Sequence, residues 1–97
     1  MKQMIFGGAI GALKRGERVA REGWNGKGMF IFLNPGSHPG NYGSHIDGVN
    51  IALFEIADTG TVTRLPNINM RSASGATVTG WLASQTDMLA EDWQIVE

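Results

Sequence analysis

The sequence lacks cysteine altogether. Without thiols the chain cannot form a disulfide framework, a thiolate zinc site or a cysteine nucleophile. This absence is compatible with a reducing cytoplasm. Disulfide cross-links, thiolate metal sites and cysteine catalysis are therefore excluded.

The chain also has little net charge. Its 8 Lys and Arg residues and 9 Asp and Glu residues give a formal charge of −1 at pH 7. Proteins that bind duplex DNA or acidic membranes make many Lys and Arg contacts to phosphate. We therefore do not expect a nucleic-acid polymer or a membrane surface as a partner.

Long hydrophobic runs are missing too. The apolar stretch over residues 4–13 follows Lys2 and so imitates a signal peptide, but it is far too short to span a bilayer. Lys14 and Arg15 come next, where a signal peptide would have its small-residue cleavage site. We therefore expect a protein that is not secreted.

What is present is typical of a small globular protein. Its 97 residues fit one domain, and 42% hydrophobic with 18% charged residues is the composition of a chain that folds. A chain of this length buries a modest core, so one copy cannot easily build a deep enclosed site. Oligomerisation would remove that restriction.

The hydrophobic pattern predicts two helical segments and several strands. Apolar residues at helical spacing indicate a short helix over 7–15, with Gly16 in the left-handed position at its end. A single helical turn is expected over 87–92, and a Gly- and Pro-rich loop over 34–50. Strands are predicted over residues 17–22, 29–33, 51–57, 61–65, 67–73, 76–83 and 93–96. These elements predict an α+β fold, in which the short N-terminal helix packs on a twisted antiparallel sheet.

Two motifs raise the question of catalysis or metal binding. Asp58 begins an Asp-Thr-Gly turn that resembles the active-site turn of retroviral-type aspartic proteases, where two subunits each supply one aspartate. The likeness is confined to three residues, and an ordinary hairpin turn is favoured. His38, His45 and Asp47 lie in the glycine-rich loop, which offers little of the rigidity that a zinc site needs. No catalytic residue and no metal site are expected.

The stretch "GWNGKG" over 23–28 has the composition of a binding edge. Trp24 offers a face for a base to stack on, Lys27 a point charge for a phosphate, and Asn25 two donors and an acceptor. Its glycines are not a Rossmann or P-loop fingerprint, because no helix follows them. The alternative is that Trp24 merely covers a small core.

The segment "GWLASQTDMLAEDW" over 80–93 offers a second set of polar and aromatic groups. If Ser84 or Thr86 caps the helical turn, backbone amides there can bind an anion, with Trp81 as an aromatic wall. Asp87 can fill that position itself, or it can accept hydrogen bonds from a ribose diol. Trp93 alternates as a core strand residue does, so we expect it to be structural.

Two blocks of the sequence, "RVAREGWNGKGMFIFL" and "GWLASQTDMLAEDW", resemble the signature blocks of the Thoeris anti-defence protein two family of small phage proteins. The segment "ALKRGERVAR" also matches, whereas the middle of the chain does not. The resemblance implies a homotetrameric sponge that captures cyclic ADP-ribose isomers made by bacterial TIR enzymes in the cytoplasm of the infected host. It also implies that some relatives hold cyclic dinucleotides of the CBASS type.

The resemblance and the residue chemistry together give one prediction of the site. We expect a nucleotide signal to bind between subunits, without cofactor and without cleavage. The alternatives are a dimeric aspartic hydrolase acting through Asp58 and a subunit whose only role is assembly. The expected ligand-binding residues are Trp24, Asn25, Lys27, Trp81, Ser84, Gln85, Thr86, Asp87 and Met88.

Overall fold

This computed structural model describes residues 3–24, 26–36 and 65–97. The chain divides into two compact units, one of residues 1–34 with 67–97 and the other of Pro35–Pro66. Everything described below belongs to the first unit. The strands predicted over 51–57 and 61–65, apart from residue 65, lie outside the described residues, as does nearly all of the loop predicted over 34–50.

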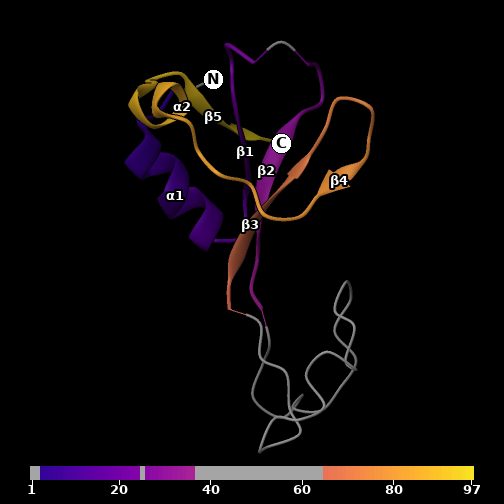
Figure 1. The fold of residues 1–97 in the computed structure, drawn as a ribbon. Helices are drawn as coiled ribbons and strands as arrows, with labels where there is room; N and C mark the ends of the chain where they lie inside the picture. Colours follow the sequence, from indigo (N-terminus) through magenta and orange to yellow (C-terminus); the bar gives the residue numbers. More distant parts are fainter. Residues whose placement is uncertain (1–2, 25, 37–64) are drawn as a thin grey trace, which may run out of the picture. The chain divides into compact units, whose positions relative to one another are not determined.

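Five antiparallel strands form one sheet in the order β4-β3-β2-β1-β5 (Figure 1). The described part of the chain forms helices α1, Phe6–Lys14, and α2, Gln85–Leu89. The strands are β1, Arg18–Arg21; β2, Phe30–Asn34; β3, Asn67–Arg71; β4, Thr77–Val78; and β5, Trp93–Val96. The α+β prediction is therefore confirmed.

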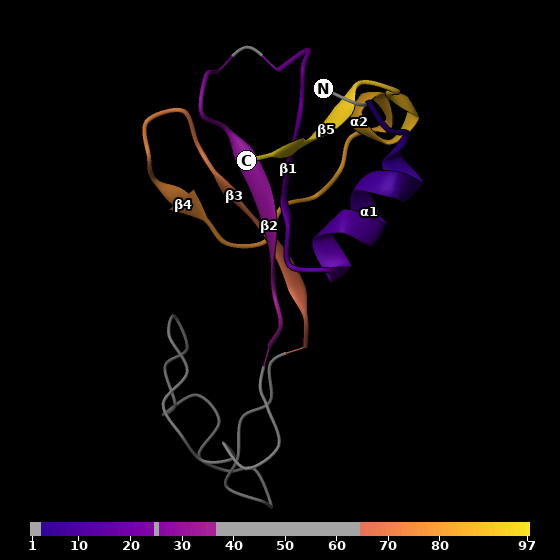
Figure 2. The same ribbon diagram turned by 180° about the vertical axis from the view of Figure 1, so that it is seen from behind.

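Helix α1 covers one face of this sheet, as Figure 2 shows from behind. Its buried residues Ala9, Ala12 and Leu13 belong to the same core cluster as Ile31 of β2 and Trp93 of β5. The helix ends as predicted, since its last turn carries Lys14 and Gly16 follows at φ 87°. Neither helix of the described residues is long and apolar enough to cross a membrane.

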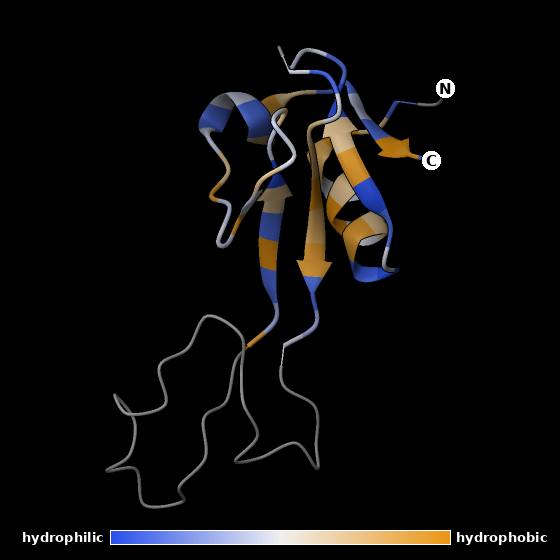
Figure 3. Cartoon of the chain, turned by 90° about the vertical axis from the view of Figure 1, so that its right-hand side faces the viewer, coloured by the Kyte–Doolittle hydropathy of each residue, from blue (hydrophilic) through white to orange (hydrophobic). Residues whose placement is uncertain are grey.

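The sheet has two faces, one packed against α1 and one pointing away from it. Successive strand residues point to opposite faces, and strand β3, which reads NINMR, shows this alternation of hydrophilic and hydrophobic residues in Figure 3. Val19 and Ile31, which are partners across β1 and β2, are fully buried on the α1 side. Their neighbours along each strand, including Arg18 and Phe30, therefore lie on the side away from α1. We call that side the open face.

Two elements have different bounds from those predicted. Strand β4 is only two residues long rather than spanning 76–83, because Gly80 adopts a positive φ of 84° and donates its N–H to Asn69 Oδ1 at 2.8 Å. Helix α2 begins at Gln85 rather than at residue 87, because Ser84 is its N-cap. The remaining described strands and α1 differ from the predicted bounds by two residues or fewer.

Candidate functional site

Three tryptophans from separate segments pack together beside α2, and we call them the tryptophan cluster. The ring centroid of Trp24 lies 5.3 Å from that of Trp93 and 6.3 Å from that of Trp81, and the last two are 6.1 Å apart. All three pairs meet edge to face, the arrangement that aromatic quadrupoles favour. Trp93 is fully buried, as its alternation in the sequence predicts, whereas the other two are half-buried. Trp24 therefore does pack over the core, with part of its surface left accessible.

Arg21, at the end of β1, ties this cluster to the C-terminal part of the chain. Its Nη1 donates to Asp87 Oδ1 at 2.9 Å and its Nε donates to Asp92 Oδ1 at 2.8 Å. The indole N–H of Trp24 donates to the same Asp87 oxygen at 3.1 Å, and the backbone N–H of Gly23 donates to Asp92 Oδ2 at 2.8 Å. These contacts fix the start of the turn between β1 and β2 against α2 and the strand that follows it.

The same contacts shift the ionisation of both carboxylates. Burial opposes the charged form of Asp87, but the hydrogen bonds from Arg21 and Trp24 outweigh it, so the pKa of Asp87 is lowered. The hydrogen bond from Arg21 is the main cause that lowers the pKa of Asp92, and the Gly23 N–H adds to it. Both groups are therefore carboxylates at neutral pH, and they neutralise Arg21.

The α2 segment uses its predicted site residues unequally. Ser84 Oγ accepts a hydrogen bond from the backbone N–H of Asp87 at 3.1 Å, so the cap predicted at Ser84 or Thr86 is at Ser84. The side chain of Asp87 points to Arg21 and Trp24, so it does not fill the N-terminus of its own helix. The three other predicted residues on this helix, Gln85, Thr86 and Met88, are exposed.

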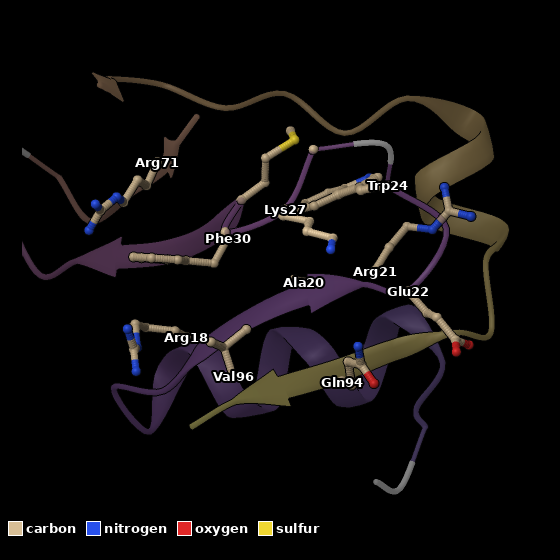
Figure 4. Close-up of a pocket in the computed structure, with 13 residues that line it drawn as sticks. Arg18, Ala20, Arg21, Glu22, Trp24, Lys27, Phe30, Arg71, Gln94 and Val96 are labelled. Carbon is tan, nitrogen blue, oxygen red and sulfur yellow. The ribbon is translucent and has the colours of Figure 1, made fainter. Parts of the chain in front are cut away.

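A groove of about 530 Å³ crosses the open face from the turn between β1 and β2 toward β3 (Figure 4). Trp24 and Lys27 line it at the turn, so two of the predicted site residues meet there. Asn25 lies outside the described residues. Trp81 and the α2 residues do not line the groove. The described residues that line it are Arg18, Ala20, Arg21, Glu22, Trp24, Gly26, Lys27, Gly28, Met29, Phe30, Arg71, Gln94 and Val96.

The groove is strongly basic although the chain as a whole is not. Of the described residues, Arg18, Arg21, Lys27 and Arg71 line it, against a single acidic residue, Glu22. Arg21 is neutralised by its two aspartates. Among the described residues, the other three cations have no carboxylate within ion-pair distance, so they give this groove a positive potential that can attract an anion.

An aromatic ring lies between two of these cations. The Cζ atom of Arg18 is 5.1 Å from the ring centroid of Phe30, and that of Arg71 is 5.9 Å from it. Next to them is a smaller hollow of about 340 Å³, which Phe32 and Thr77 also line. Sequence reasoning missed Arg18, Phe30 and Arg71. Strand alternation alone could have placed each on the open face, but only the strand pairing brings them together.

Two glycines shape the turn that carries Lys27. Gly28 has a φ of 83°, in the left-handed region that favours glycine. At Gly26 an added Cβ would lie 2.5 Å from the Sδ of Met29 and 2.8 Å from the Cβ of Ala73, so only glycine fits. Gly26 thus lets the turn pack closely against the hairpin between β3 and β4, and Gly28 supplies its left-handed backbone conformation.

The residues weighed for catalysis and metal binding, Asp58, His38, His45 and Asp47, lie outside the described residues. Within the part of the chain that is described, no three His, Asp or Glu side chains gather as metal ligands.

Comparison with known proteins gives two matches. The family model for the Tad2-like domain, described as Thoeris anti-defense 2-like, matches residues 4–96. The protein named Thoeris anti-defense 2 from Bacillus phage SP01 is 35% identical over 102 residues, which cover 97% of this chain and 96% of that protein. The likeness spans both blocks singled out in the sequence and the segment between them.

Proposed function

The chain belongs to the Thoeris anti-defense 2-like family, and from that premise we propose that it captures a cyclic ADP-ribose isomer and holds it without cleaving it. By withholding this signal from its effector, the protein would block Thoeris immunity. Because the signal is made inside the infected bacterium, we propose that the protein acts in the host cytoplasm. The observation that carries the proposal is the groove, where three cations without carboxylate partners among the described residues lie beside two aromatic rings.

The groups in the groove match the chemistry of this ligand class. A cyclic ADP-ribose isomer carries a pyrophosphate, two riboses and an adenine. Arg18, Lys27 and Arg71 can bind the pyrophosphate oxygens, since guanidinium and ammonium groups donate charge-assisted hydrogen bonds to phosphate. The exposed part of Trp24 offers an apolar surface for the base.

Affinity argues for a site shared between subunits. To deplete a signal at low concentration, a sponge needs a Kd of about 100 nM or better, which is about −10 kcal/mol. Ligands bound that tightly are usually largely enclosed, whereas this groove is open to solvent. We therefore propose a homo-oligomer, a tetramer by resemblance, in which a neighbouring subunit closes the groove. Leu82 and Leu89, which are 91% and 79% exposed, are apolar surfaces available for such contacts.

The lining of the groove supports storage rather than hydrolysis. The described residues that line it include no serine, threonine, cysteine, histidine or aspartate, so the usual nucleophiles and most general bases are missing there. Glu22 is the one carboxylate among these described lining residues, and its Oε2 accepts a hydrogen bond from Gln3. A carboxylate pair, which would be needed to activate water by the aspartic-protease route, is not found among these residues.

Calorimetric titration of the full chain with a cyclic ADP-ribose isomer tests the proposal. We expect a Kd of about 100 nM or lower at a fixed number of sites per chain. Lys27→Ala should weaken binding more at low salt than at high salt, because salt already screens an exposed charge. The matched control is Lys14→Ala, which removes an exposed lysine from α1, outside the groove. Wild-type protein that shows no binding would refute the proposal.

Cyclic dinucleotides are a further ligand class that the resemblance implies, and we propose that they be tested as competitors in the same titration. A competitor that displaces the cyclic ADP-ribose isomer shares its site, whereas one that binds without displacing it occupies another surface.

A further inference from the structure

We propose that Arg18 and Arg71, lying on either side of Phe30, select ligands that carry two linked phosphate groups over ligands that carry one. The inference rests on the proposed function in that it concerns the same groove. It goes further by naming two residues that distinguish a diphosphate from a single phosphate. The ligand feature that they recognise is the diphosphate bridge.

The three residues lie on the same face of three neighbouring strands, with Arg18 offset along β1 from the position opposite Phe30. Phe30 of β2 is the direct partner of Arg71 of β3, and Arg18 lies on β1 on the other side of β2. Strands in a sheet are about 4.8 Å apart and rise about 3.4 Å per residue, so the two arginines start from backbone positions about 12 Å apart. In Figure 4 their side chains lie on opposite sides of the Phe30 ring. A ligand must therefore extend over this ring to contact both guanidinium groups.

The ring holds both guanidinium groups without using their hydrogen-bond donors. Each Cζ atom lies within 6 Å of the ring centroid, the range of cation–π attraction, at 5.1 Å for Arg18 and 5.9 Å for Arg71. Such contact engages the charge of the guanidinium, while its N–H groups stay available. Among the described residues, neither arginine has a carboxylate partner. The pair is thus partly ordered before a ligand arrives, which lowers the entropy cost of binding.

Two other arginines of the described residues differ from this pair, because each forms an ion pair with a carboxylate of the protein. Arg21 donates to two carboxylates, and Arg15 pairs with Glu17 at 3.1 Å. Their donors are engaged by the protein itself. Arg18 and Arg71 are exposed, lack such partners among the described residues, and line both the groove and the adjoining smaller hollow. Two cations that share one aromatic ring repel each other, and a bound polyanion would relieve that repulsion.

The number of phosphates decides how many arginines a ligand can engage. A single phosphate can accept two parallel hydrogen bonds from one guanidinium group. A diphosphate spans a longer distance and offers a second set of oxygens to the other arginine. Engaging both cations therefore favours a diphosphate such as the bridge of ADP-ribose compounds over a monophosphate or an unphosphorylated nucleoside.

The test uses inorganic pyrophosphate and inorganic phosphate as probes, with a cyclic ADP-ribose isomer titrated in parallel. Wild-type protein should bind pyrophosphate at least about tenfold more tightly than phosphate, since one further charge-assisted contact is worth about that factor or more. Arg18→Gln and Arg71→Gln should each weaken pyrophosphate binding by at least about tenfold and leave phosphate binding nearly unchanged. Arg15→Gln is the control, because it removes a guanidinium group outside the groove.

Two further variants separate charge from geometry. Arg18→Lys keeps the positive charge but loses the planar fork, so it should recover only part of the pyrophosphate affinity. Phe30→Leu keeps an apolar side chain but removes the ring that holds both arginines, so it should weaken pyrophosphate more than phosphate. Both arginines are exposed, so their replacement should not unfold the protein, which circular dichroism would verify.

The outcomes distinguish this inference from the proposed function. Equal binding of phosphate and pyrophosphate, or arginine variants that bind pyrophosphate as the wild type does, would overturn the inference even if the cyclic ligand binds. Pyrophosphate binding that depends on both arginines, in a protein that ignores the cyclic ADP-ribose isomer, would uphold the inference and refute the proposed function.

Discussion

Removing the carboxylate of Asp87 should destabilise the fold through contacts far from it in sequence. Its Oδ1 accepts hydrogen bonds from Arg21 at 2.9 Å and from the indole N–H of Trp24 at 3.1 Å, and its side chain is only 15% exposed. In Asp87→Ala the indole N–H loses this acceptor. Arg21 keeps Asp92 as a partner, so its charge does not become unpaired. The Ser84 cap also survives, because it uses the backbone of Asp87.

The size of the effect follows from these contacts. Hydrogen bonds to charged groups contribute about 1.5–3 kcal/mol each, and part of that is recovered where water reaches the freed donors. We therefore expect Asp87→Ala to lower the free energy of unfolding by about 2–4 kcal/mol, out of the 5–15 kcal/mol that is typical of such domains. Asp87→Asn retains an acceptor for the indole but loses the charge, so it should cost roughly half as much.

Urea denaturation at one fixed protein concentration measures this effect, because an oligomer's stability depends on concentration. Glu91→Ala is the matched control: it removes an exposed carboxylate from the same region and should change stability by less than about 0.5 kcal/mol. An Asp87→Ala variant as stable as that control would show that the contacts of Asp87 with Arg21 and Trp24 contribute nothing, and would refute the reasoning.

Three further predictions concern glycines and pH. Gly26→Ala should destabilise by about 1–3 kcal/mol, because its Cβ would lie 2.8 Å from that of Ala73; wild-type stability in urea would contradict the close approach. Gly7→Ala should stabilise α1 by up to about 1 kcal/mol, since its Cβ meets no atom closer than 4.0 Å; a lowered melting temperature would contradict this. The pKa values of Asp87 and Asp92 are lowered in the folded protein, so both carboxylates stabilise it. This stabilisation is complete above the unfolded-state pKa and is lost as pH falls through the folded-state values. Stability should therefore fall below about pH 4, and less steeply when both residues are asparagine.

Local signals in the sequence predicted much of the described fold. The helical spacing of apolar residues before Gly16 predicted α1, and the alternation around Trp93 predicted β5 with its bounds. Ser84 was one of two candidates for the cap of α2, and the structure selects it. These features depend on residues a few positions apart, so local pattern is sufficient to find them.

The groove depends on pairing that local pattern does not contain. Arg18, Phe30 and Arg71 come from three strands, and they lie close together on one face only because β2 lies between β1 and β3 in this register. The net charge of −1 did not indicate the basic groove, because acidic residues elsewhere in the chain balance its arginines and lysine. Asp87 was identified as a candidate ligand group, but its partner Arg21 is distant in sequence and was not foreseen.

The central claim is that the protein stores its nucleotide unchanged, and one measurement tests it most directly. The protein is incubated with an excess of a cyclic ADP-ribose isomer, freed of unbound ligand, and heated until the fold is lost. Chromatography and mass spectrometry then identify and count the released molecules. We predict recovery of the intact signal in a fixed ratio to protein chains. Recovery of cleaved products, whose amount grows with time beyond the number of protein chains, would contradict the claim and identify an enzyme instead.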